Sequence, residues 1–247
     1  MLGRPILESL VSAGFKVTVL KRQGSRSPDE YPVSVTVSRI PDDMPVEALT
    51  ESLRGQDALV VAINGSQADV QKRLADAAVR AGVIRYIPAD YGSCDSSSQA
   101  TQELLPLYGK KTEIREYLTQ VAQANPGFSW TSIVCGHFFT NIDVYLHIFI
   151  KERRADVLND GEKKSSLSTL ARVGEAAARI LQRPEQTKNQ MLYIQSFCVS
   201  QNEVVRAFEH ATGEKWQVAN LDAESFKDAE KAKADKGVKS ATDELVW

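Results

Sequence analysis

The sequence lacks long apolar runs and any excess of charge of one sign. No stretch reaches the roughly eighteen apolar residues that a membrane span needs, and the first residues do not combine a positively charged region with an apolar one, as a signal peptide does. The formal net charge is −2 with both signs interspersed, a balance that favours neither nucleic acid nor an anionic membrane as a partner. We therefore expect a cytoplasmic protein.

Cysteine is also scarce. The three cysteines are odd in number, widely spaced and outside any Cys-x-x-Cys arrangement: Cys94, Cys135 and Cys198. This pattern excludes a disulfide framework and gives no metal-ligand spacing. We expect three ordinary reduced thiols and no metal site.

Strand and helix patterns alternate along the first 136 residues. Strands are predicted at 15–23, 33–40, 58–63, 83–92 and 128–136, and helices at 3–14, 44–55, 67–81 and 110–124. The segment 58–63 is nearly all apolar, which is typical of a strand covered on both faces. Repeated strand, helix, strand units of this kind predict an α/β fold with a doubly wound parallel sheet, Rossmann-like, with helices on both faces.

The C-terminal third has a different pattern of predicted elements. Helices are predicted at 168–182 and 200–213 and strands at 189–196 and 215–222, while the charged run 227–239 is typical of a solvated helix face. We interpret the chain as a dinucleotide-binding domain over 1–145 and a smaller α/β cap over 146–247, interleaved with the main domain.

In doubly wound sheets, ligands bind beyond the carboxyl ends of the strands. The loops that follow the predicted strands are therefore expected to converge; they are 21–28, 63–67, 88–96 and 135–141. Within them, Asp90 is interpreted as a capping carboxylate. Asn64 and Gly65 follow the apolar strand, where a small and an amide side chain can approach and bind a nucleotide. The alternative is that Asn64 or Ser66 only caps the next helix.

Five segments, in order, carry a family resemblance: "LGRPILESLVSAGFKVTVLKR", "LRGQDALVVAI", "LADAAVRAGVIRYIPADYG", "KKTEIREYL" and "SWTSIVCGHFFTN". Over residues 3–218 the chain resembles the NmrA-like and isoflavone reductase-like branch of the atypical short-chain dehydrogenases. That family begins with a strand and a Gly-x-x-Gly-x-x-Gly turn, of which Gly3 occupies the third glycine position. The strand and the earlier glycines are absent, so we expect an incorrect start codon or a spliced variant rather than an adapted short form.

A basic pair stands at the end of the first predicted strand. Asp or Glu usually holds the ribose hydroxyl of NAD at this position, whereas a 2′-phosphate needs positive charge. Lys21 and Arg22 stand there, with no acid before Asp29. The resemblance likewise implies a phosphate-reading basic residue, and a planar guanidinium suits bidentate phosphate contact. Arg22 is thus expected to select NADPH over NADH, the alternative being a solvated basic pair.

Lys111 is the candidate catalytic residue, and the assignment depends on the resemblance. In the resembling reductases, a lysine four residues before an arginine acts as a general acid or base beside the nicotinamide, and "KTEIR" matches that spacing with Arg115. Lysine can do this when burial and nearby positive charge lower its pKa. The alternatives are Lys110 in the same role, or two surface lysines. The Tyr-x-x-x-Lys dyad of ordinary short-chain dehydrogenases is absent.

The segment "GHFFTN" carries the last candidate. The resemblance implies an aromatic residue near the nicotinamide, and Phe138 falls at that position; a core aromatic is the alternative. The family's asparagine two residues earlier is Gly136 here, which weakens the implied nicotinamide contact. His137 has the residue type that titrates near neutrality.

Two functions follow from these patterns. The first is an NADPH-dependent reductase of a small conjugated or aromatic substrate. The second, which the likeness to NmrA implies, is a non-catalytic dinucleotide-binding redox sensor that signals to a protein partner. Retention of Lys111 and Phe138 favours the enzyme, whereas Gly136 and the incomplete glycine turn favour the sensor.

Overall fold

The computed structural model describes residues 1–246; Trp247, the last residue of the expected cap, lies outside the described residues. The chain forms two compact units. Unit 1 comprises Met1–Tyr91, Leu107–Val134 and Leu170–Tyr193, and unit 2 comprises Gly92–Pro106, Cys135–Thr169 and the chain from Ile194 onward. The polypeptide therefore passes several times between the units.

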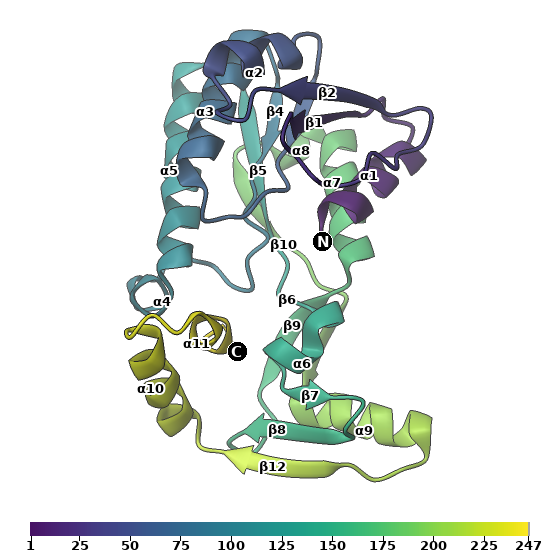
Figure 1. Cartoon of the computed structure of the whole chain (residues 1–247), viewed down its shortest axis with the longest axis vertical. Coiled ribbons are helices and arrows are strands. Elements are labelled where there is room, and N and C mark those ends of the chain that lie inside the picture. Colours follow the sequence, from purple (N-terminus) through teal and green to yellow (C-terminus); the bar gives the residue numbers. More distant parts are fainter. Residues whose placement is uncertain (247) are drawn as a thin grey trace. The chain divides into compact units, whose positions relative to one another are not determined.

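Parallel strands form the centre of unit 1 (Figure 1). A four-stranded sheet has the order β10-β5-β4-β3, and all of its pairings are parallel. Its strands are β10 (Gln190–Tyr193), β5 (Ser129–Val134), β4 (Arg85–Ile87) and β3 (Ala58–Val60). A separate parallel pair consists of β1 (Thr18–Arg22) and β2 (Thr36–Ile40).

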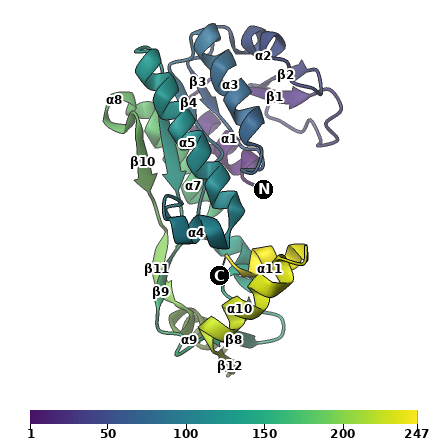
Figure 2. The same ribbon diagram turned by 90° about the vertical axis from the view of Figure 1, so that its left-hand side faces the viewer.

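Helices cover both faces of the four-stranded sheet. Helices α3 and α5 lie on one face and α1 and α7 on the other (Figure 1, Figure 2). The helices of this unit are α1 (Gly3–Ser12), α2 (Val46–Leu53), α3 (Ala68–Ala81), α5 (Pro106–Ala124), α7 (Leu170–Gln182) and α8 (Pro184–Thr187). The predicted doubly wound α/β fold is confirmed.

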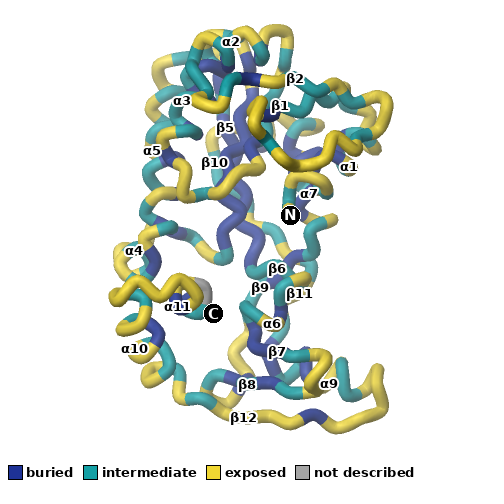
Figure 3. Tube along the Cα trace, in the orientation of Figure 1, coloured by how far each residue is buried: buried dark blue, intermediate teal, exposed yellow. Residues whose placement is uncertain are grey.

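The predicted ends of two strands were wrong. Strand β2 begins at Thr36, because a turn in which the Val35 amide donates to the Pro32 carbonyl at 2.9 Å precedes it, and this turn leaves Val33 fully exposed. Strand β3 ends at Val60, and its residues are half-buried rather than covered on both faces. It is an edge strand, as is β1, and no other strand of residues 1–246 pairs with their outer edges. Strand β5, by contrast, is buried along most of its length (Figure 3).

The predicted division of the chain differs from the observed contacts. Helix α7 and strand β10 belong to unit 1, although the sequence analysis places them with the cap. Strand β10 pairs with β5 over Gln190–Tyr193, and α7 packs against α1. Residues 170–193 therefore complete the main sheet and one of its helical layers.

The close approach of α1 and α7 depends on Gly174. A Cβ at this position would lie 2.4 Å from the Pro5 carbonyl oxygen and 2.5 Å from Ser9 Oγ. Glycine to alanine normally favours a helix by about 1 kcal/mol. We expect Gly174→Ala instead to lower the free energy of unfolding by about 1–3 kcal/mol, because the helices must separate.

Chemical unfolding measures this difference, and Gly3→Ala in α1 is the matched control. A Cβ on Gly3 would meet only the Ala62 Cβ at 3.9 Å, an ordinary contact. We expect the control to be neutral or to raise the free energy of unfolding by up to about 1 kcal/mol. Equal stability of the two variants would contradict the close approach of the helices.

Unit 2 combines two small mixed sheets with helices. One sheet has the order β11-β9-β6 and the other β12-β8-β7. The strands are β6 (His137–Phe138), β7 (Ile148–Phe149), β8 (Arg154–Leu158), β9 (Lys164–Ser168), β11 (Phe197–Ser200) and β12 (Gln217–Leu221). The helices include α4 (Gln99–Leu104), η1 (Phe139–Asn141), α6 (Ile142–Tyr145), α9 (Gln201–Thr212), α10 (Ala223–Ala234) and α11 (Lys239–Glu244).

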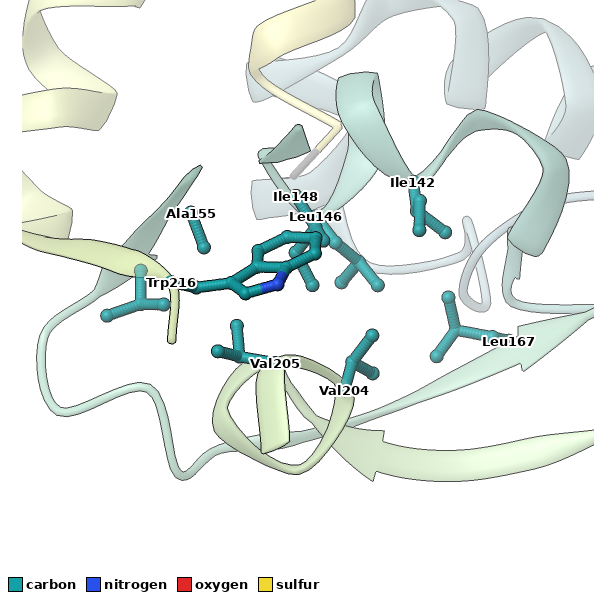
Figure 4. Packing of buried hydrophobic residues seen from close by; sticks show 9 residues of the cluster. Ile142, Leu146, Ile148, Ala155, Leu167, Val204, Val205 and Trp216 are labelled. Atoms are coloured by element: carbon teal, nitrogen blue, oxygen red, sulfur yellow. The ribbon is translucent and has the colours of Figure 1, made fainter. Parts of the chain in front are cut away.

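The core of unit 2 surrounds Trp216. Side chains from α6, β7, β8, β9 and α9 converge on it (Figure 4). Ile148, Val157 and Leu167 are fully buried there. Unit 2 thus has a hydrophobic core of its own. Within residues 1–246, no helix is both long enough and apolar enough to cross a bilayer.

Candidate functional site

The segments that follow β3 and β4 meet at Gly65. A Cβ built on Gly65 would lie 3.0 Å from the Ala89 carbonyl oxygen and 3.4 Å from Cε of Lys111. Three elements are therefore brought together: the loop after β3, the loop after β4 and helix α5. Of the four loops predicted to converge, 63–67 meets the first residues of 88–96 within unit 1, beside the candidate catalytic lysine. The convergence of 21–28 and 135–141 with them stays a prediction.

Lys111 and Lys110 lie in different environments. Lys111 is only 8% exposed, and its ammonium lies 5.1 Å from the centroid of the Tyr108 ring. The Lys110 side chain is 54% exposed and pairs with Glu113 Oε2 at 3.0 Å. Its hydrogen bond to Glu113 raises the pKa of Lys110, which stabilises its protonated form. Only Lys111 lies at the junction, so the surface alternative describes Lys110 alone.

A buried ion pair holds the same face of α5 against the sheet. Arg115 follows Lys111 by one helical turn, and its Nε lies 3.6 Å from Asp90 Oδ2, with side chains 8% and 3% exposed. Asp90 also accepts a hydrogen bond from the Ser132 hydroxyl on β5. The sequence analysis interpreted Asp90 as a cap. It instead joins the end of β4 to both α5 and β5.

Gln71 fixes the loop after β4 and was missed by the sequence analysis. Its Oε1 accepts from the Ala89 amide at 2.8 Å, and its carbonyl accepts from the Tyr86 hydroxyl at 3.0 Å. Complete burial raises the pKa of Tyr86 well above its usual value. The spacing in the sequence could have indicated this residue, because Gln71 lies three residues before Leu74 and therefore on the apolar face of α3.

Asn64 is exposed and bonds within its own turn. Its Oδ1 accepts from the Ser66 amide at 2.9 Å and from the Ser66 hydroxyl at 2.8 Å. Helix α3 begins after Gln67, which provides no side-chain cap. Asn64 therefore shapes the loop rather than capping the helix itself, and it presents Gly65 toward Lys111. Its contact with a nucleotide stays a prediction.

The start of α1 lies beside the end of β3. Gly3 approaches Ala62, as its 3.9 Å Cβ contact indicates. Leu2, the N-cap, makes no side-chain cap, and the first turn holds no acidic residue. Such a helix start offers backbone N–H donors and a positive dipole end to an anion, although Pro5 has no N–H to give.

Lys21 and Arg22 have different surroundings at the end of β1. Successive side chains of a strand point to opposite faces. The Lys21 side chain is 5% exposed and pairs with Asp29, while its ammonium also lies 5.6 Å from the Tyr31 ring centroid. Arg22 is exposed, and among the described residues its guanidinium has no hydrogen-bond or ion-pair partner. Of the two, only Arg22 has a cationic group that no other described residue binds.

Phe138, Gly136 and His137 belong to unit 2. Phe138 is half-buried on β6. A Cβ on Gly136, whose φ is +68°, would lie 2.1 Å from the Ser166 carbonyl oxygen. His137 stacks on Tyr145 at 5.5 Å, and burial lowers its pKa to about 4. The expectation that His137 titrates near neutrality was wrong, because burial disfavours its charged form.

Sequence comparison identifies the family. The NmrA-like family model matches residues 1–239. Oxidoreductase aprR of Aspergillus flavus is 36% identical over 214 residues, covering 86% of this chain and 71% of that protein. Oxidoreductase poxI of Penicillium oxalicum is 29% identical over 250 residues, covering 99% of this chain and 77% of that protein. The chain belongs to the NmrA-like family, as the sequence motifs implied.

Solved structures share the fold. Leucoanthocyanidin reductase from Vitis vinifera, in a binary complex with NADPH, superposes with a TM-score of 0.81 at 15% identity, covering 99% of this chain and 81% of that one. AtPrR2 with NADP+ and (+)-pinoresinol has a TM-score of 0.80 at 20% identity, with the same coverage. These likenesses confirm the Rossmann-like reductase fold.

Proposed function

We propose that this protein is an NADPH-dependent reductase of a small conjugated or aromatic substrate, with Lys111 as its proton donor. The observation that carries the proposal is the burial of Lys111 at the junction of the loops after β3 and β4, against Gly65. Doubly wound sheets bind their ligands beyond the carboxyl ends of the strands. A buried ammonium at that position is suited to chemistry rather than to surface solvation.

The residues of unit 1 fit a nicotinamide dinucleotide phosphate at several points. Arg22 offers an exposed guanidinium to the 2′-phosphate, with Lys21 beside it in sequence. The start of α1 at Gly3 offers N–H donors to the pyrophosphate. Gly65 lacks the side chain that would crowd the Ala89 carbonyl and Lys111, and Asn64 holds that turn in place. The role of Phe138, which belongs to unit 2, stays a prediction of the family resemblance.

When bound, the cofactor supplies the hydride. The Lys111 ammonium donates a proton to the oxygen on which negative charge develops in the substrate, or relays one to it. Asp90 and Arg115 position Lys111, because their ion pair holds α5 against β4 and β5.

The relatives support this class of reaction. The two related fungal proteins are oxidoreductases by name. The structural neighbours include isoflavone reductase, leucoanthocyanidin reductase with NADPH, and AtPrR2 with NADP+ and (+)-pinoresinol. Pinoresinol, leucoanthocyanidin and isoflavone are aromatic molecules, and these names support the proposed substrate class.

Calorimetric titration of the protein with NADPH and NADH tests the cofactor assignment. We expect Arg22→Ala to weaken NADPH binding by about 10- to 100-fold, since a charge-assisted contact to phosphate contributes about 1.5–3 kcal/mol, and to leave NADH binding unchanged. Arg26→Ala removes another exposed arginine of the same loop and is expected to change neither affinity. Equal effects of the two variants, or no heat with either nucleotide, would contradict the assignment.

A second function is favoured by one observation. The Ser166 carbonyl occupies the space that a side chain at Gly136 would need, so the amide that the family resemblance implies near the nicotinamide has no room there. A redox sensor that binds the dinucleotide and a protein partner would not need that contact. Consumption of NADPH with any member of a panel of conjugated and aromatic substrates supports the reductase. A partner captured only in one oxidation state of the cofactor, without turnover, supports the sensor.

A further inference from the structure

We propose that Asp29 is a specificity-determining residue that lowers the preference of this protein for NADPH over NADH, by occupying the cations that a 2′-phosphate would otherwise engage. This inference depends on the proposed function, because it concerns how the same nucleotide site discriminates a 2′-phosphate from a 2′-hydroxyl on the ribose. It departs from the sequence analysis, which treated the end of β1 as purely basic.

The loop after β1 folds back so that Asp29 lies at the end of the strand. Asp29 Oδ1 accepts from Lys21 Nζ at 2.5 Å, and its other oxygen pairs with Arg39. The Lys21 ammonium also donates to the carbonyls of Ser27 at 2.7 Å and Pro28 at 3.4 Å. Seven residues separate Asp29 from Arg22 in sequence, but the folded loop places its carboxylate on the neighbouring cation.

Asp29 compensates a like-charged pair that the sheet itself creates. Lys21 and Arg39 are register partners in the parallel ladder of β1 and β2. Like charges on neighbouring strands destabilise a sheet, and a carboxylate bound to both offsets this repulsion. The hydrogen bond from Lys21 is the largest cause that lowers the pKa of Asp29, so the carboxylate stays ionised at neutral pH.

The same two cations would be attractive to a phosphate. A 2′-phosphate is an anion with several acceptor oxygens, and it can engage Lys21 and Arg39 only in competition with Asp29. The Asp29 side chain is 44% exposed, so an approaching phosphate also meets its charge directly. A neutral 2′-hydroxyl is not repelled. Asp29 should therefore penalise NADPH and leave NADH nearly unaffected.

Asp29→Asn tests the proposal, with Glu30→Gln as the matched control. Both variants remove one negative charge from the same loop, but Glu30 is exposed and has no hydrogen-bond or ion-pair partner among the described residues. We expect Asp29→Asn to tighten NADPH binding by about three- to tenfold, consistent with one unit charge removed near a phosphate, and to change NADH binding by less than about twofold. Glu30→Gln should change the ratio of the two affinities by less than about twofold.

Asp29→Ser is a second test, because a serine side chain is too short to reach Lys21. If Asp29 competes with the phosphate for the cations, Asp29→Ser should tighten NADPH binding as Asp29→Asn does. Adenosine 2′,5′-bisphosphate and 5′-AMP serve as probes of the adenosine end alone, and only the former should bind more tightly to the variants. An unchanged or lower NADPH preference in Asp29→Asn, or an equal rise in Glu30→Gln, would overturn the inference while leaving the reductase proposal intact. Failure of the parent protein and both variants to bind either dinucleotide would overturn the proposed function and this inference together.

Discussion

Lys111→Met is expected to lower the rate of NADPH consumption by a factor of about 10²–10⁴, the usual contribution of a positioned general acid. Methionine keeps the length of the side chain and its packing against Tyr108, but it has no proton to donate. The proposed role of Lys111 is toward the substrate rather than the nucleotide, so we expect NADPH affinity to change by less than about threefold. Steady-state NADPH absorbance and calorimetry on the same preparations measure the two quantities.

Lys110→Met is the matched control for this experiment. It makes the same chemical change one residue earlier in α5, at a side chain that is exposed and paired with Glu113. We expect nearly full turnover from this variant. Loss of activity in Lys110→Met with retention in Lys111→Met would assign the proton donor to the other lysine.

Asp90→Asn is expected to lower the free energy of unfolding by about 3–5 kcal/mol, the usual result of removing one partner of a buried ion pair. Asparagine retains the shape of the side chain and an acceptor for the Ser132 hydroxyl, but it removes the negative charge that Asp90 places beside the buried Arg115 guanidinium. Single domains have total stabilities of only about 5–15 kcal/mol, so this one change removes a large part. Urea unfolding followed by tryptophan fluorescence measures it.

Ser132→Ala separates the ion pair from the hydrogen bond. It removes the donor to Asp90 but keeps both charges, and we expect a loss of only about 1–2 kcal/mol. If Asp90→Asn destabilised the protein no more than Ser132→Ala, the ion pair would not be the main connection between α5 and the sheet.

Elements with local signals were predicted well from the sequence. Helix α3 was predicted over 67–81 and is observed over Ala68–Ala81, ending at Gly82 in the left-handed conformation. Helix α9 was predicted over 200–213 and begins with a capping box formed by Ser200 and Glu203. Caps and a helical apolar period are properties of neighbouring residues, so a single sequence contains them.

Elements that depend on distant partners were missed or misplaced. Strands β8 and β9 were not predicted, because each has few β-branched residues and each is stabilised by partners far along the chain, such as β12 for β8. Strand β10 was predicted, but its pairing with β5 was not. Such pairings depend on packing rather than on local propensity.

The same distinction applies to the candidate site. The motif "KTEIR" located Lys111 and Arg115 by their spacing, and helical geometry brings them to one face. The Asp90 and Asp29 interactions could not be read in this way. Asp90 meets Arg115 only because α5 packs on the sheet, and Asp29 meets Lys21 only because an irregular loop folds back.

Strands β1 and β2 form a sheet of their own, and this separation affects how easily they unfold locally. No backbone ladder among residues 1–246 connects the two sheets, and a two-stranded sheet is only marginally stable alone. Amide protons of β1 and β2 should consequently exchange with solvent through a local fluctuation, well before those of β4 and β5. Ligand binding at the end of β1 would slow that exchange selectively, making these amides reporters of occupancy.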